Sequence, residues 1–218
     1  QTRQAFELLR AGGFKIVAHW MPNLLGATLE TDRRDFIQLW DGLCPDELKI
    51  YPTQLLENSD LYDCWRRGEY QPYTTAELVS LIADVKTAIP RYCRVNRVVR
   101  DIPSTHVIEG NRRTSLRQDV QVELERRGQK CQCIRCREVK GRKVSQENLH
   151  LEDIVYPAGA AEEHFLSFVT QDDHLAAFLR LSLPGQNAIS LGLEDLQQAA
   201  IIREVHVFGQ SIPVGSEE

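Results

Sequence analysis

Strand-like hydrophobic runs alternate with helical patterns through the first hundred residues. Residues 14–20, 48–51 and 94–100 predict strands, and residues 30–43 and 75–88 carry apolar side chains at helical spacing. Strands that are separated by helices are typical of a parallel sheet with crossover helices. The alternation therefore predicts an α/β fold. It begins in mid-pattern, so we expect the chain to be part of a longer protein.

The second half of the chain changes character. A helix is predicted over residues 116–127, with Ser115 as its N-cap. After it, residues 162–170, 174–183 and 199–208 predict long strands joined by tight turns, which is typical of an antiparallel meander. No helical pattern follows the last strand, so one face of this sheet is expected to be exposed.

The composition excludes several classes of protein. The 218 residues are 42% hydrophobic and 26% charged, unlike a disordered, collagen-like or coiled-coil chain. No apolar run reaches the roughly 18–20 residues that a membrane span needs, and the N-terminus lacks a signal-peptide pattern. The six cysteines are too sparse for a disulfide scaffold, so the cytoplasm is the expected compartment.

The net charge of −5 conceals a strong asymmetry. Residues 86–143 hold 16 Lys and Arg against 6 acidic residues, a net charge of +10, whereas residues 147–218 have a net charge of −10. A cationic segment between acidic flanks is typical of a chain that binds a polyanion. We interpret residues 86–143 as a nucleic-acid-binding segment, although a surface salt bridge is the simpler explanation for any single arginine.

Around the third predicted strand, cations recur at every third residue: Arg91, Arg94, Arg97 and Arg100. Side chains alternate between the two faces of an extended strand, so these four cannot form one row unless the strand bulges or bends. Arg112, Arg113 and Arg117 are expected on a loop and an early helical turn, which is a better place for phosphate contacts.

The strongest local chemical signal is the cluster Cys131, Cys133 and Cys136. Three thiols so close in sequence can bind one ion if the backbone turns tightly, and thiolates favour Zn²⁺ or an iron–sulfur cluster. We expect structural zinc, with unrelated thiols or a disulfide as the alternative. Zinc needs a fourth ligand, and the sequence leaves four candidates open: His106, His150, Cys93 and Cys44.

Other features of the sequence are weaker signals. Residues 21–28 follow a strand and precede a helix, the place where α/β folds bind ligands. Glu204 and His206 alternate along one strand and share a face, so they are either an acid–base pair or half-buried sheet residues. Glu162 and Glu163 are most simply exposed turn residues.

Seven short motifs occur in order along the chain. They are Met21-Pro22, LKIYPT at 48–53, WRRGEY at 65–70, Pro72-Tyr73, RDIP at 100–103, CQCIRCRE at 131–138 and REVHVFG at 203–209. This set closely resembles the catalytic subunit of Elongator in its short bacterial or archaeal form. The resemblance covers nearly the whole chain. That family joins a radical S-adenosylmethionine (radical-SAM) barrel to a GNAT-type acetyltransferase domain.

The resemblance implies a three-part organisation within the α/β (α+β) class. Residues 1–100 would be the later βα units in the C-terminal part of a partial TIM-type radical-SAM barrel. Residues 101–146 would be a basic zinc-binding linker. Residues 147–218 would be the N-terminal strands of a GNAT-type acetyltransferase domain.

The resemblance also implies a function. The family modifies the wobble uridine of tRNA (U34) to 5-carboxymethyluridine, with acetyl-CoA as donor and a radical generated from S-adenosylmethionine at a [4Fe–4S] cluster. We therefore expect an acyltransferase that binds the tRNA anticodon stem-loop and acetyl-CoA. Zinc would lie in this chain, and the cluster and S-adenosylmethionine in the full-length protein, so this chain alone would be inactive. A homodimer is expected, with accessory subunits only in a eukaryotic form.

The resemblance assigns no catalytic residue here, but it implies three binding sets. The zinc ligands are the three clustered cysteines, and none of the six cysteines matches a ligand of the iron–sulfur cluster. The strand that lines acetyl-CoA is Glu204, Val205, His206 and Val207. The tRNA-facing residues are Lys86, Arg91, Arg94, Arg97, Arg100, Arg112 and Arg113. The family loop Pro-Gly-Leu-Pro-Gly-Ser is Pro-Asn-Leu-Leu-Gly-Ala at residues 22–27, a departure that bears on S-adenosylmethionine binding.

Two alternatives belong to other functional classes. One is a lysine acetyltransferase of the histone type, whose basic peptide would prefer the acidic region 147–218. The other is a non-catalytic, zinc-stabilised RNA-binding module, which would bind tRNA without acetyl-CoA hydrolysis even in the full-length protein.

Overall fold

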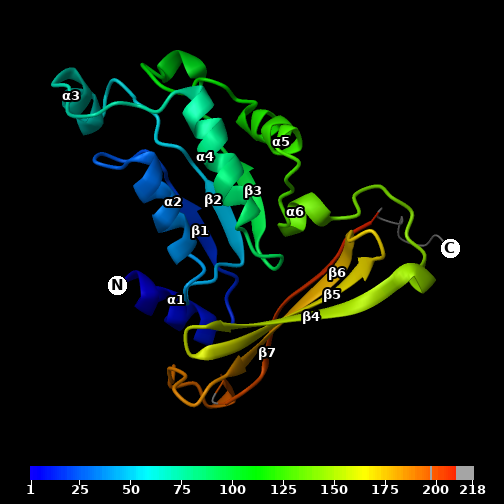
Figure 1. The fold of residues 1–218 in the computed structure, drawn as a ribbon. Coiled ribbons are helices and arrows are strands. Elements are labelled where there is room, and N and C mark those ends of the chain that lie inside the picture. The colour runs from blue at the N-terminus through cyan, green and yellow to red at the C-terminus, as the bar shows by residue number, and fades with distance from the viewer. Residues whose placement is uncertain (197, 210–218) are drawn as a thin grey trace. The chain divides into compact units, whose positions relative to one another are not determined.

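The computed structural model describes residues 1–196 and 198–209, which fold into two compact units (Figure 1). The first unit is Val17–Cys133, and the second combines Gln1–Ile16 with the chain from Ile134 onward. Helices and strands are mixed along the chain, so the predicted α/β class is confirmed. The three-part division at residues 100 and 146 stays a prediction.

The first unit is built on a parallel sheet. Its strands pair in the order β1 (Val17–Trp20), β2 (Glu47–Ile50) and β3 (Arg94–Val98). The helices of this unit include α2 (Leu29–Gln38), α3 (Asp60–Arg66), α4 (Thr75–Thr87) and α5 (Leu116–Arg126). The parallel strands and crossover helices that the alternation predicts are confirmed. Helix α3 was not predicted, because its seven residues include no buried side chain.

One face of the parallel sheet is buried. Leu48 and Ile50 of β2 pair with Val95 and Val98 of β3, and all four side chains are in the core. Trp20 of β1 is also buried, in edge-to-face contact with a phenylalanine of α2 at 4.8 Å between ring centroids. Burial of this face leaves the alternate residues of each strand on the opposite face.

Helix ends follow local capping rules only in part. The Thr74 side chain accepts a hydrogen bond from the Glu77 backbone and the Glu77 side chain accepts one in return, which forms a capping box at the start of α4. Ser115 is the N-cap residue of α5, as predicted, but its side chain makes no capping hydrogen bond. The predicted strand 14–20 begins only at Val17, and the helix predicted over 30–43 ends at Gln38.

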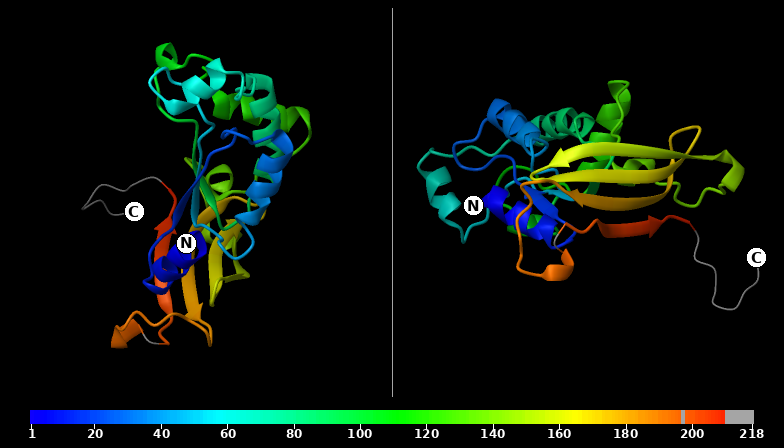
Figure 2. Two further views of the ribbon diagram at one scale, coloured as in Figure 1. Left: turned by 90° about the vertical axis from the view of Figure 1, so that its left-hand side faces the viewer. Right: turned by 90° about the horizontal axis from the view of Figure 1, so that it is seen from below.

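The second unit contains an antiparallel meander (Figure 2). Its strands pair in the order β4 (Leu149–Ala158), β5 (Ala161–Thr170), β6 (Leu175–Pro184) and β7 (Ile201–Val207). Its helices include α1 (Thr2–Ala11) and α6 (Ile134–Arg137). The predicted meander is confirmed, but β4 was missed because Glu152, Asp153 and Pro157 interrupt its hydrophobic pattern.

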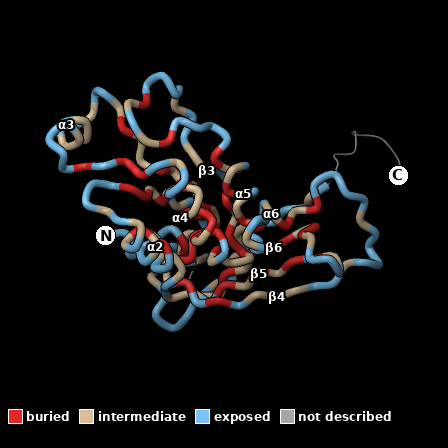
Figure 3. Tube along the Cα trace, turned by 45° about the horizontal axis from the view of Figure 1, so that its top comes forward, coloured by how far each residue is buried: buried red, intermediate tan, exposed pale blue. Residues whose placement is uncertain are grey.

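The meander has one buried and one exposed face. Buried stretches follow β5 and β6, whereas β4 is more exposed (Figure 3). On the exposed face lie six large apolar side chains: Leu151, Val155, Phe168, Ile202, Val205 and Val207. The sequence predicted an uncovered sheet face, and the described residues show one. The chain beyond residue 209, on which that prediction also relied, lies outside the described residues.

Buried ion pairs join α1 to the meander. Glu163 lies within β5 and its side chain is 0% exposed, so the interpretation of this residue as an exposed turn residue is wrong. Its carboxylate accepts hydrogen bonds from Arg203, whose side chain is also 0% exposed, and lies 3.4 Å from a guanidinium nitrogen of Arg10 on α1. Two guanidinium groups thus share one buried carboxylate.

A second buried cation packs between aromatic rings. The guanidinium carbon of Arg180 on β6 lies 5.1 Å from the ring centre of Phe165 and 5.2 Å from that of Phe178. Its Nε donates to Glu204 on β7 at 2.8 Å, and Glu204 also accepts from Lys15 at 2.9 Å. The core of the second unit therefore holds both apolar and ionic contacts.

Among the described residues, no helix combines the length and hydrophobicity that crossing a membrane requires.

Replacement of Glu163 by glutamine removes the anion between Arg10 and Arg203 and leaves two cations buried without it. We expect Glu163→Gln to lower the free energy of unfolding by about 3–5 kcal/mol, measured by urea denaturation. Glu162→Gln changes the neighbouring side chain, which is 61% exposed, and should stay within about 0.5 kcal/mol of wild type. Equal effects of the two changes would contradict the buried network.

Candidate functional site

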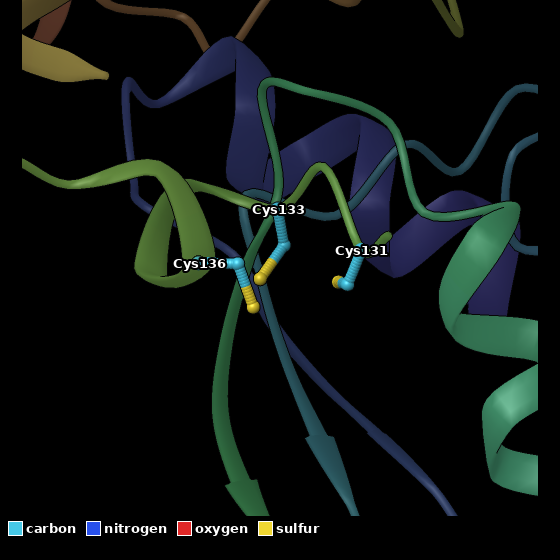
Figure 4. Close-up of side chains that lie close together, drawn as sticks. All are labelled: Cys131, Cys133 and Cys136. Carbon is cyan, nitrogen blue, oxygen red and sulfur yellow. The ribbon is translucent and has the colours of Figure 1, made fainter. Parts of the chain in front are cut away.

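The three clustered cysteines converge. Cys131 and Cys133 are buried, and Cys136 on α6 is half-buried. Their sulfur atoms all lie within 4.8 Å of one another, and the side chains point toward one small region (Figure 4). None of the six cysteines forms a disulfide, so the disulfide alternative is wrong.

The backbone explains this convergence. Helix α5 is followed by Gly128 at φ +64°, a left-handed conformation that reverses the chain just before Cys131. The short helix α6 then holds Cys136 next to the preceding loop. Tetrahedral zinc, with Zn–S bonds of about 2.3 Å, places its sulfur ligands roughly 3.8 Å apart, so the cluster fits this ion. Across residues 1–196 and 198–209, no further His, Cys, Asp or Glu joins the three, so the fourth ligand stays open.

A bulge in β3 changes where its arginines lie. The pairing with β2 shifts between Leu48 and Lys49, so that Val95 pairs with Leu48 but Arg97 pairs with Lys49. Because Asn96 is left over, Arg94 and Arg97 lie on the same face of the strand. The sequence predicted that these cations could share a face only if the strand bulged or bent, and the bulge is present for two of them.

The residues predicted to face tRNA differ in exposure. Lys86 on α4 is only 1% exposed, and Arg91 and Arg94 are half-buried. The remaining four are exposed: Arg97, Arg100, Arg112 and Arg113.

The exposed arginines have only weak or partial contacts. Arg97 pairs with Asp101 at the surface, and Arg100 lies 5.9 Å from the ring centre of Tyr51. Arg113 contacts Asp119 at 3.3 Å, and its side chain is 62% exposed. Exposed pairs of this kind contribute little to stability and can be exchanged for a phosphate.

Other cations of the basic segment are committed to internal contacts. Arg127 donates to Glu123 and Asp84 at 2.6 Å. Arg117 donates to the backbone carbonyls of Val95 and Asn96. The net charge of residues 86–143 therefore overstates the cationic surface.

The acidic region has even fewer available cations. Arg180 and Arg203 are its only Lys or Arg residues, and both side chains are buried in the ion pairs described above. The acidic region thus offers no exposed Lys or Arg to a polyanion among its described residues.

The predicted acetyl-CoA strand is β7. Glu204 and His206 share a face as expected, but each contacts different partners: Glu204 pairs with Arg180 and Lys15, and His206 stacks on Phe178 at 5.6 Å. Burial by itself raises the pKa of Glu204, but the two cations lower it by more, so the pKa lies below its ordinary value. Such a carboxylate is a poor general base, so the structure does not assemble the acid–base pair. Val205 and Val207 lie on the exposed face, at 64% and 75% exposure.

Loop 21–28 is held by a buried polar network that the sequence did not reveal. Asn23 is 2% exposed, and its backbone N–H donates to Asp32 of α2 at 2.8 Å. Tyr73 donates its hydroxyl to the same carboxylate at 2.9 Å, and Tyr70 donates to the Asn23 carbonyl at 2.9 Å. Burial raises the pKa of Tyr70 to about 12, and burial also raises the pKa of Asp32. Only the motifs at residues 65–73 hinted at these tyrosines.

Comparisons with known proteins agree with this architecture. Residues 45–126 match the model of the Radical_SAM C-terminal domain. A tRNA uridine(34) acetyltransferase of Dehalococcoides mccartyi is 39% identical over 96% of this chain and 47% of its own length. Elongator complex protein 3 of Homo sapiens is 34% identical over 99% of this chain and 40% of its own length.

A solved structure is similar as well. The archaeal Methanocaldococcus infernus Elp3, with an N-terminal deletion, has a TM-score of 0.88 and 35% identity, over 98% of this chain and 51% of that one. The chain thus spans about half the length of the relatives it matches. The predicted resemblance is confirmed: over nearly its whole length this chain is similar to the catalytic subunit of Elongator and to tRNA uridine(34) acetyltransferases.

Proposed function

We propose that the full-length protein containing this chain modifies U34 of tRNA, as an acyltransferase that uses acetyl-CoA to form 5-carboxymethyluridine. The observation that carries the proposal is the similarity over nearly the whole chain to relatives named tRNA uridine(34) acetyltransferase. The exposed arginines of the first unit support it, because they offer an RNA-binding surface. Among the contacts of the described residues, none favours a lysine acetyltransferase, and Glu204 is poorly suited to deprotonate an ammonium group.

The proposed tRNA surface consists of the exposed arginines and their half-buried neighbours. It comprises Arg91, Arg94, Arg97, Arg100, Arg112 and Arg113. We leave Lys86 out, because its side chain is buried in α4. A base in an anticodon loop is already unpaired, so presenting it costs less than flipping a base out of a duplex.

The cofactors divide between this chain and the rest of the protein. We assign zinc to the three clustered cysteines, where a closed thiolate site would fasten the segment after α5. Acetyl-CoA is assigned to β7 and the strands beside it. S-adenosylmethionine and the [4Fe–4S] cluster belong to the radical-SAM part, and no cysteine of this chain is proposed as a cluster ligand. This chain by itself would not complete the reaction.

The compartment and assembly are further proposals. Free thiols and a tRNA substrate both suit the cytoplasm. A homodimer is proposed, with accessory subunits only in a eukaryotic context.

The salt dependence of tRNA binding tests the proposed surface. In the full-length protein, Arg112→Glu combined with Arg113→Glu should weaken tRNA binding roughly tenfold or more at physiological salt. The slope of log affinity against log salt should become smaller in magnitude by about two. Filter binding over a salt series measures both quantities. Reversal of two exposed cations outside the basic segment, Arg34→Glu with Arg67→Glu, is the matched control. If both double variants bind alike, the assignment of this surface is wrong.

Metal analysis tests the zinc assignment. We expect one zinc ion per chain by elemental analysis, and Cys133→Ser should remove most of it because a serine hydroxyl is a poor zinc ligand. Chelator treatment should lower the melting temperature of wild type and leave that of the variant unchanged. Cys64→Ser, which changes a cysteine outside the cluster, should keep the full zinc content. Iron and sulfide in place of zinc would refute the assignment.

A further inference from the structure

Asn23 has a backbone conformation that few side chains adopt. Its φ is +66°, in the left-handed region that favours glycine, and it lies directly after β1 in the loop at the carboxyl end of the strand. Asparagine tolerates this region because its short amide can bond to nearby backbone groups. The position is therefore strained for most residues, and buried side-chain contacts must maintain it.

The Asn23 side chain is bonded to a second loop. Its Oδ1 accepts from the backbone N–H of Tyr73 at 2.7 Å, and its Nδ2 donates to the carbonyl of Gln71 at 3.4 Å. A glycine at this position could adopt the same φ but could make neither bond. The asparagine side chain therefore supplies two contacts between the loops that a glycine would lack.

The backbone of Asn23 is fixed as well. Its N–H donates to the buried carboxylate of Asp32, and its carbonyl accepts from the Tyr70 hydroxyl. Tyr73 closes the ring of contacts through its own hydroxyl on Asp32. One residue thus ties the loop after β1 to α2 and to residues 70–73.

These two loops border a groove of about 650 Å³. It is lined by residues 26–30 and 69–73 with Asn23 and Glu77, and the lining includes three glutamates but neither Lys nor Arg. Carboxyl ends of parallel strands are where α/β folds bind ligands. A lining without cations does not suit RNA phosphates, whereas it suits a small ligand that carries positive charge.

We propose that Asn23 is a positioning residue that holds the wall of this groove in its ligand-binding shape before the ligand arrives, and that the ligand is a sulfonium nucleoside. The identity of the ligand rests on the proposed function, because that function requires S-adenosylmethionine. The prearrangement of the loop rests only on the contacts of Asn23. A wall that is ordered in advance avoids an entropy loss on binding.

The experiment compares Asn23→Gly with wild type in the full-length protein, prepared anaerobically with its cluster. Hydrogen exchange reports on the Tyr73 amide, and calorimetry measures binding of S-adenosylmethionine without a reductant, so that the ligand keeps its sulfonium charge and is not cleaved. We expect Asn23→Gly to speed exchange at Tyr73 at least tenfold and to weaken binding about tenfold, with a more unfavourable binding entropy. Asn23→Asp keeps the acceptor oxygen and should restore most of the protection at Tyr73.

Lys140→Gly is the matched control, because Lys140 is another left-handed residue (φ +53°) but is exposed and far from this loop in sequence. It should change neither exchange at Tyr73 nor ligand affinity. A lower melting temperature of Asn23→Gly with unchanged exchange and affinity would overturn the proposal and leave only a structural role. Failure of wild type to bind S-adenosylmethionine would refute the ligand, and exchange at Tyr73 would then decide whether Asn23 holds the loop.

Discussion

Burial of one face of a short parallel sheet determines the layout of the first unit. Once Leu48, Ile50, Val95 and Val98 enter the core, the alternate residues of each strand must lie on the opposite face. The bulge at Asn96 is compatible with this burial, because it keeps both valines on the buried side although they are three residues apart. The same bulge brings Arg94 and Arg97 onto one face, so core packing arranges cations that the proposed function needs.

The core of the second unit contains buried charged side chains. Arg180 and Arg203 lie inside, where Glu204 and Glu163 offset their charge and aromatic rings flank Arg180. Ion pairs of this kind contribute little net stability but are costly to break, because one partner alone would be a buried charge. With these cations turned inward, the acidic half presents no exposed Lys or Arg among its described residues. The acidic half therefore contributes no Lys or Arg to the proposed RNA contacts.

The local backbone conformation shapes two proposed ligand sites, the cysteine cluster and the groove beside Asn23. Gly128 and the short helix α6 bring three thiols within reach of one ion, and Asn23 ties the loop after β1 to residues 70–73. In both places a left-handed residue lets the chain turn sharply. The difference is that Gly128 has open space around it, whereas Asn23 is buried and bonded through its side chain.

The sequence alone determined the α/β class, the parallel strands, the meander, the cysteine cluster and the family resemblance, because hydrophobic period, cysteine spacing and ordered motifs are local properties of the chain. It failed where distant residues decide the outcome. Strand β4 was missed because its pairing with β5 outweighs its poor hydrophobic pattern, and Glu163 was misplaced because only the fold brings Arg10 and Arg203 to it. The burial of Lys86 and the network around Asn23 likewise depend on contacts between segments that are distant in sequence. No local sequence pattern predicts such contacts.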